Sequence, residues 1–139
     1  MRLLIIEDDP ILALAFASTL EGADHAVVGV AYNAEEALEI AAQEEGIDLA
    51  LMDINLEGND EGIDLARQLR TRFGIPSLFV SGQIAVAQAN ADVALGLMRK
   101  PFPPADLRRA VEAVAYARIG SPQPVANLPP ALTLFTTAR

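Results

Sequence analysis

The chain has 139 residues, of which 52% are hydrophobic and only 5% aromatic, so it suits one domain with a core of aliphatic side chains. Its formal net charge of −9 at pH 7 argues against direct binding to nucleic acid, which requires clustered lysine and arginine. Cysteine is absent, which excludes disulfides, thiolate metal sites and thiol catalysis.

The N-terminal segment favours a location away from membranes. Its apolar run, residues 3–6, is too short for a signal peptide and meets an acidic residue at once. No later stretch reaches the length of a transmembrane helix. We therefore expect a cytoplasmic protein that makes no contact with a membrane.

Five predicted strands alternate with five predicted helices along the chain. The strands cover residues 3–6, 26–31, 49–52, 77–80 and 94–98. The helices begin at Asp9-Pro10, at Asn33, in the loop after Leu56, at Gln83 and at Pro103-Pro104, and the first, third, fourth and fifth end at Gly22, Gly74, Asp92 and Gly120. Apolar runs without polar alternation are typical of strands buried on both faces.

This alternation predicts the fold class. Right-handed crossovers place helices on both faces of a parallel sheet. We therefore predict an α/β fold over residues 1–120, with a flavodoxin-like, doubly wound, five-stranded parallel sheet of order 2-1-3-4-5. The second strand, 26–31, ends without reactive residues, as an edge strand away from the crevice of such a sheet would.

Residues 121–139 are predicted to be a Pro-rich C-terminal tail with no output domain. Prolines 122 and 124 indicate an extended linker, and an apolar segment follows at 128–135. We expect a frayed terminus there. The alternative is that Leu132, Leu134 and Phe135 dock on the domain or on a partner.

Polar side chains follow four of the five predicted strands, where parallel strands open onto one crevice. Glu7 and Asp8 follow the first strand and Asp53 follows the third. Three carboxylates this close raise one another's pKa unless a cation neutralises them. Mg²⁺ prefers oxygen ligands, so these carboxylates and the backbone carbonyl of Asn55 predict a magnesium site.

The same crevice is predicted to suit phosphoryl transfer. Asp53 beside a metal ion is a candidate nucleophile toward phosphorus. Lys100 would supply positive charge to the phosphoryl oxygens, and Ser81 a hydrogen bond. Lys100 is the single lysine among ten basic residues, the other nine being arginine. This bias indicates that the site needs a compact ammonium group.

Taken together, these residues resemble a known family. Residues 2–118 are similar to the receiver domain of two-component response regulators, in particular to single-domain, chemotaxis-regulator-like members. The resemblance is carried by Glu7-Asp8, Asp53, Ser81 and Lys100-Pro101, each after its strand and in this order.

The resemblance implies a role for each matching position. Asp53 would be the phosphoacceptor, Ser81 the switch hydroxyl, and Lys100 the phosphoryl contact, with a cis bond before Pro101. Glu7, Asp8, Asp53 and the Asn55 carbonyl would hold Mg²⁺. Leu97 departs from the pattern, since many members carry an aromatic residue there that moves with the switch hydroxyl.

The implied function is that of a stand-alone phospho-receiver. It would accept a phosphoryl group from a sensor histidine kinase or a histidine phosphotransfer protein and signal by contact with an unidentified protein target. It would be a monomer or a phosphorylation-dependent dimer. It is not expected to be an enzyme beyond catalysing its own phosphorylation and dephosphorylation.

Three alternatives compete with this interpretation. A pseudo-receiver that only binds partners would have lost Asp53, an acidic residue or Lys100, and none is lost. A small aspartyl-phosphate phosphohydrolase usually needs an acid where Asn55 stands. A flavodoxin would need a Ser/Thr-rich phosphate loop after the first strand, where this chain has acids. Outside the site, we expect Asp9 to be a helix cap and His25 to be exposed.

Overall fold

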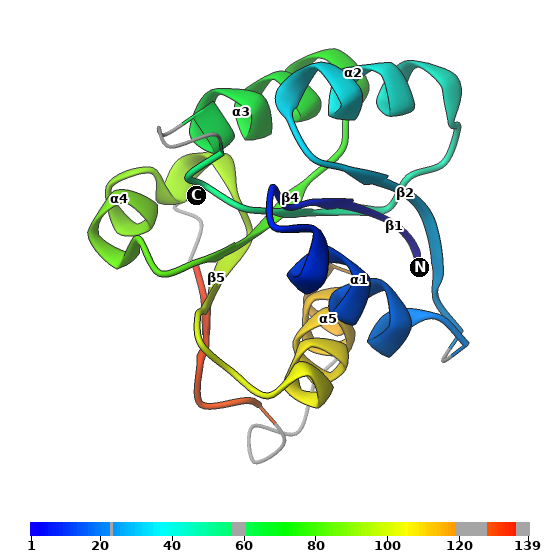
Figure 1. Ribbon diagram of the computed structural model, residues 1–139. Coiled ribbons are helices and arrows are strands. Elements are labelled where there is room, and N and C mark those ends of the chain that lie inside the picture. The colour runs from blue at the N-terminus through cyan, green and yellow to red at the C-terminus, as the bar shows by residue number, and fades with distance from the viewer. Residues whose placement is uncertain (23, 57–60, 119–127, 136–139) are drawn as a thin grey trace.

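The computed structural model describes residues 1–22, 24–56, 61–118 and 128–135, which form a single sheet with helices on both faces (Figure 1). The strands are β1 (Arg2–Ile6), β2 (Ala26–Ala31), β3 (Leu49–Met52), β4 (Ser77–Ser81), β5 (Gly96–Arg99) and β6 (Leu132–Leu134). The helices are α1 (Pro10–Leu20), α2 (Ala34–Gln43), α3 (Glu61–Phe73), α4 (Ile84–Ala89), α5 (Pro104–Arg118) and the 3₁₀ turn η1 (Ala91–Val93).

The strand order confirms the predicted topology in the core of the sheet. It runs β2-β1-β3-β4-β5-β6, and the first five of these strands are parallel to one another. β6 is antiparallel to β5, so the sheet has six strands rather than the predicted five. None of the helices in the described part of the chain is long and apolar enough to cross a membrane.

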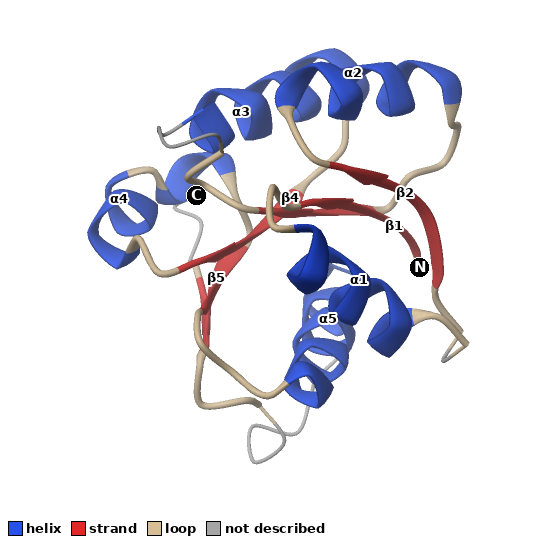
Figure 2. Ribbon diagram, viewed as in Figure 1, coloured by secondary structure: helices blue, strands red, loops and turns tan. Residues whose placement is uncertain are grey.

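Side chains alternate between two apolar layers, one on each face of the sheet. Along β1, Leu4 and Ile6 point into the layer under α2 and α3, whereas Leu3 and Ile5 point into the layer under α1 and α5. Figure 2 shows these helix pairs on opposite sides of the strands. Helices cover both faces of the sheet, so polar side chains can reach the surface only at the ends of the central strands.

Helix starts follow the predicted caps. The Asp9 side chain accepts hydrogen bonds from the backbone N–H groups of Ile11 and Leu12, and that of Asn33 accepts one from Glu36. The predicted helix over 83–92 is shorter, because Asn90 leaves helical geometry and its side chain donates to the carbonyl of Val86. The expected end of the last helix, Gly120, lies outside the described residues.

The expectation of a frayed terminus is wrong for residues 128–135. β6 pairs with β5 in the register Gly96–Leu134, Leu97–Thr133 and Met98–Leu132. Backbone hydrogen bonds close both ends of the pairing, from Arg99 N to Ala131 O and from Phe135 N to Leu95 O, each 2.9 Å. Leu132 and Leu134 pack on one core layer and Phe135 on the other. The alternative that these three side chains dock on the domain is confirmed.

A glycine at the start of α3 holds this helix against the chain that follows β3. A side chain on Gly62 would place its Cβ 2.2 Å from the Asp53 carbonyl oxygen and 2.6 Å from the Ile54 Cα. The Gly62 N–H donates to the Ile54 carbonyl over 2.8 Å. This close approach of two backbones fixes the segment that carries Asp53.

We expect Gly62→Ala to lower the free energy of unfolding by about 2 kcal/mol or more, because the overlap is with backbone that has little room to move. Urea unfolding followed by circular dichroism measures the change. Gly82→Ala is the matched control, since a Cβ there meets nothing within 4 Å, and it should shift stability by at most about 0.5 kcal/mol. Equal stabilities of the two variants would contradict this view of Gly62.

Candidate functional site

Three carboxylates meet where β1 and β3 end. β1 and β3 pair in parallel with Ile6 opposite Met52, so the residues that follow them emerge side by side. Backbone hydrogen bonds fix the positions of these residues. Asp53 N donates to Ile6 O over 2.9 Å, and Glu7 N donates to Ala31 O over 3.0 Å. One carboxylate oxygen from each of Glu7, Asp8 and Asp53 lies within 4.8 Å of the others. The structure thus brings together the three acids that the sequence indicated.

These acids differ in their exposure. Glu7 and Asp53 are only 2% and 6% exposed, whereas Asp8 is exposed. A buried carboxylate loses hydration and must recover the lost energy from donors or cations nearby. The Glu7 carboxylate accepts a hydrogen bond from the Asp9 backbone N–H over 3.2 Å, and Asp53 Oδ1 accepts one from the Asn55 N–H, also over 3.2 Å.

Lys100 approaches the same crevice from β5. Its Nζ lies 2.6 Å from Glu7 Oε1 and 3.9 Å from Asp53 Oδ2. The peptide bond between Lys100 and Pro101 is cis, as the resemblance implied. The ammonium therefore pairs with Glu7 first and stands within reach of Asp53. Within the described part of the chain, Glu7 and Asp53 thus share the positive charge of Lys100.

The carboxyl group of Asp53 holds its proton more strongly than usual. Burial, followed by the neighbouring Glu7 carboxylate, raises the pKa of Asp53 to about 7, although Lys100 opposes the shift. Near neutral pH, a proton on Asp53 or a further cation beside it therefore reduces the repulsion between these acids. The three acids are an oxygen-rich set suited to a hard divalent cation.

Ser81 and Asn55 complete the crevice from β4 and from the segment after β3. Ser81 is 2% exposed, and its Oγ accepts a hydrogen bond from the Gln83 N–H over 3.1 Å. Its carbonyl accepts one from the Lys100 N–H over 3.0 Å, which ties the two strand ends together. Asn55 Oδ1 is buried and makes no hydrogen bond with the described residues.

Two further residues, Asp9 and His25, were predicted to lie outside the site. Asp9 caps α1, as predicted, with its Oδ1 2.9 Å from the Ile11 nitrogen. The prediction that His25 is exposed is wrong: its side chain is 6% exposed and lies between the N-terminal amine and Glu112 of α5. Burial and the amine's positive charge lower the His25 pKa. It stands beside the start of β2, at the opposite end of the strands from the carboxylates.

Sequence reasoning missed an apolar surface beside the site. Ile11 and Leu14, on the first turns of α1, are 78% and 69% exposed. The sequence predicts a helix from Asp9-Pro10 to Gly22, but that prediction does not separate the covered face of the helix from its exposed one. Their spacing of three residues, which puts them on one side of a helix, was the available signal.

Known proteins are similar to this chain in sequence. The family model of the response regulator receiver domain matches residues 3–112. The phyllosphere-induced regulator PhyR of Methylorubrum extorquens is 31% identical over 117 residues, which cover 83% of this chain and 43% of PhyR. The chain spans about half the length of the curated relatives it matches.

Solved structures of receiver-domain proteins have a fold similar to that of this chain. The anti-anti-sigma factor PhyR of Bartonella quintana, solved as a mutant, is 26% identical with a TM-score of 0.73, covering 86% of this chain and 50% of that one. A CheY-like receiver domain protein of Methanospirillum hungatei is 25% identical with a TM-score of 0.69, covering 86% and 98%. The match over residues 3–112 and the shared sheet order lead to one conclusion: this chain belongs to the response regulator receiver domain family.

Proposed function

We propose that this chain is a phospho-receiver in which Asp53 accepts a phosphoryl group from a phosphohistidine of a sensor histidine kinase or histidine phosphotransfer protein. The observation that carries the proposal is the buried Asp53 carboxylate, held between an acidic cluster and the only lysine of the chain. A buried carboxylate next to an ammonium group is poised to attack an electrophile and to have the product's charge neutralised.

The transfer is a displacement at phosphorus. An Asp53 carboxylate oxygen attacks the phosphorus, the bond between phosphorus and the donor imidazole nitrogen breaks, and that nitrogen keeps the electron pair and takes up a proton. Lys100, 3.9 Å from Asp53 Oδ2, moves from Glu7 toward the new phosphoryl oxygens, and the Ser81 hydroxyl donates to one of them. In hydrolysis, a water oxygen attacks phosphorus and the bond between phosphorus and Asp53 breaks, with its electron pair staying on the carboxylate. Inorganic phosphate leaves, and the attacking water gives up one proton to solvent.

The residues present fit a magnesium ion. Glu7, Asp8 and Asp53 would hold it with carboxylate oxygens, and Asn55 with its backbone carbonyl. When bound, Mg²⁺ supplies positive charge to the phosphoryl oxygens. The fit rests on two observations: one oxygen from each of the three carboxylates lies within 4.8 Å of the others, and burial together with the Glu7 charge raises the pKa of Asp53.

The partners in this proposal are proteins rather than nucleic acid or membrane. The donor's phosphohistidine must reach a carboxylate that is 6% exposed, so the donor must cover the rim of the crevice. Ile11 and Leu14 stand on that rim, because α1 begins two residues after Asp8. Exposed aliphatic side chains of this kind mark protein contact surfaces. The proposal places the chain in the cytoplasm, as a signalling protein and not an enzyme acting on other substrates.

The downstream target is proposed to be a protein as well. PhyR of Bartonella quintana is an anti-anti-sigma factor, which supports a protein as the target here too. The formal charge of −9 of this chain supports the same conclusion here, since phosphate backbones repel an acidic surface.

We expect incubation with Mg²⁺ and phosphoramidate to add one phosphoryl group, detected by intact mass. The adduct should be lost in Asp53→Asn and in the presence of a chelator, because Asp53 is the nucleophile and the cation neutralises charge. Asp9→Asn is the matched control: asparagine still caps α1, so the adduct should persist. An adduct on the Asp53→Asn variant would contradict the proposal, and no adduct despite bound Mg²⁺ would favour a pseudo-receiver.

Mg²⁺ affinity should rise with pH. The pKa of Asp53 in the free protein is raised to about 7, so at lower pH the ion must displace a proton and its affinity should fall by about tenfold per pH unit. Above the pKa the carboxylate is already ionised and the affinity should level off. Isothermal titration calorimetry in two buffers of different ionisation enthalpy measures both affinity and proton release. A dissociation constant that stays the same between about pH 6 and pH 8 would argue against this assignment of the raised pKa.

The α1 surface gives a prediction on donor choice. Replacing Ile11 and Leu14 by aspartate should slow phosphotransfer from a histidine phosphotransfer protein at least about tenfold, because contact area is lost near the site. Phosphorylation by phosphoramidate should be unchanged, since a small donor needs no docking surface. Quench-flow measurement of radiolabelled transfer compares the two donors, and equal slowing with both would point to damage to the site itself.

A further inference from the structure

We propose that Phe16 and Phe102 are positioning residues for the phosphoryl transfer: their stacked rings hold the loop that follows Lys100 against α1, and so keep the ammonium within reach of Asp53. This inference rests on the proposed function, because it concerns the lysine that would contact the phosphoryl group. It deepens that function by naming two side chains that act through Lys100 rather than on the phosphoryl group themselves.

The two rings join a helix to a loop. Phe16 lies on α1, and Phe102 lies in the segment between β5 and α5. Their ring centroids are 5.7 Å apart and their planes differ by 11°, which is the geometry of a favourable aromatic pair. Phe16 is buried and Phe102 is half-buried, and both pack in the apolar layer under α1 and α5. The stack therefore anchors the loop to the core of the domain.

The loop has few other means of attachment. Residues 101–105, which lead from Lys100 into α5, have the sequence Pro-Phe-Pro-Pro-Ala. In this stretch, which the structure describes throughout, the side chain of Phe102 is the one that is not exposed. The three prolines have no backbone N–H and cannot donate hydrogen bonds that would hold the loop. Its attachment to the core thus falls mainly to a single aromatic ring.

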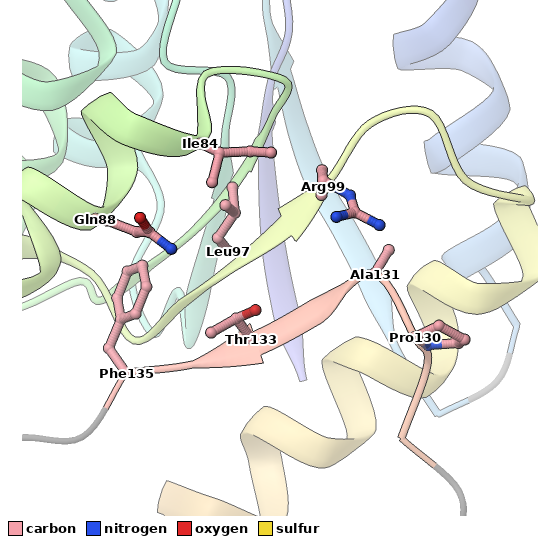
Figure 3. Close-up of a pocket in the computed structure, with 8 residues that line it drawn as sticks. All are labelled: Ile84, Gln88, Leu97, Arg99, Pro130, Ala131, Thr133 and Phe135. Atoms are coloured by element: carbon pink, nitrogen blue, oxygen red, sulfur yellow. The ribbon is translucent and has the colours of Figure 1, made fainter.

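This ring is closely connected to Lys100. Figure 3, drawn around a pocket beside β5, shows the chain leaving β5 at Arg99 and crossing as a loop to α5. One residue, Pro101, separates Lys100 from Phe102, and its ring fixes its own φ angle, so the connection has little freedom. On the other side, Lys100 N donates to Ser81 O over 3.0 Å. The Lys100 backbone is thus held by β4 and, through the rings, by α1.

The position of this backbone matters because one ammonium must reach two acids. Lys100 Nζ lies 2.6 Å from Glu7 Oε1 and 3.9 Å from Asp53 Oδ2, and the side chain is 23% exposed. A lysine ammonium is strongly hydrated and sits on a flexible stem, so a loop displaced outward would let it turn toward water. The other ring of the stack belongs to α1, which begins two residues after Asp8. The stack therefore keeps the lysine segment in a fixed relation to the acidic one.

The stack can be removed while the fold is kept. α1 and α5 also pack through aliphatic side chains, and Arg108 of α5 donates to the Thr19 carbonyl over 3.0 Å. Leucine at position 16 or 102 retains apolar contact with this layer but cannot stack. Phe16→Leu and Phe102→Leu therefore separate the effect of the stack from that of apolar packing.

The first test measures the rate of phosphorylation by phosphoramidate and Mg²⁺, followed by intact mass. Phe16→Leu and Phe102→Leu should each lower the rate about tenfold, as a small displacement of a catalytic group does. The double variant should be no slower than either single variant, because both residues act through one stack. Mg²⁺ affinity should be unchanged, since the carboxylates follow β1 and β3. Phe73→Leu is the matched control: Phe73 is also half-buried but ends α3, near the start of β4, and this variant should react at the parent rate.

The second test asks whether Phe102 acts through Lys100. In a chain that already carries Lys100→Gln, adding Phe102→Leu should slow phosphorylation no further. A general loss of stability would slow the reaction equally with and without the lysine. Phe102→Tyr keeps a ring that can stack and should react at the parent rate. Circular dichroism at the assay temperature checks that each variant is folded.

Two results would overturn the inference. One is a parent rate for folded Phe102→Leu and Phe16→Leu. The other is equal slowing by Phe102→Leu in the presence and in the absence of Lys100. In both cases a parent chain that is phosphorylated on Asp53 would leave the proposed function standing. If the parent chain takes up no phosphoryl group on Asp53, the proposed function fails and this inference fails with it.

Discussion

The rest of the structure depends on one constraint: two buried carboxylates lie side by side and share one ammonium group. Glu7 and Asp53 are held together because β1 and β3 are paired in register and both end at the crevice. Lys100 Nζ lies 2.6 Å from Glu7 and 3.9 Å from Asp53, and burial followed by the Glu7 charge raises the pKa of Asp53 to about 7. A cation close to Asp53 would lower this pKa, because it favours the charged form of the carboxyl group.

Keeping such a cluster together requires a rigid frame, and the parallel sheet supplies it. Both faces of the central strands are covered by aliphatic layers, so the strand ends cannot tilt to separate the charges. Because Gly62 has no side chain, α3 packs closely against the backbone of Asp53. The hydrogen bond from Lys100 N to Ser81 O holds the end of β5 against β4. The repulsion between Glu7 and Asp53 is therefore resisted by packing that lies outside the site.

The sequence predicted which acids and which lysine would lie close together, because an apolar run that stops at a polar side chain is visible locally. Glu7, Asp53 and Lys100 each follow a strand, and Ser81 is the last residue of β4. β6 was not predicted, because residues 132–134 are three of a short apolar segment whose pairing depends on β5, more than thirty residues earlier. His25 was misjudged for a similar reason: its cover comes from α5 and the N-terminal amine. Long-range contacts, not local pattern, decide both cases.

The position of Lys100 joins the site to the edge of the sheet. The chain has no second lysine, so among the described acids the ammonium can neutralise Glu7 or a phosphorylated Asp53 but not both equally. Those two charge arrangements differ first at the end of β5, where Arg99 and Lys100 bond to opposite neighbours. β4 is buried on both faces, whereas the C-terminal strand has three residues and a half-exposed surface. The acidic cluster and the outer edge of the sheet are thus joined through two consecutive residues at the end of β5.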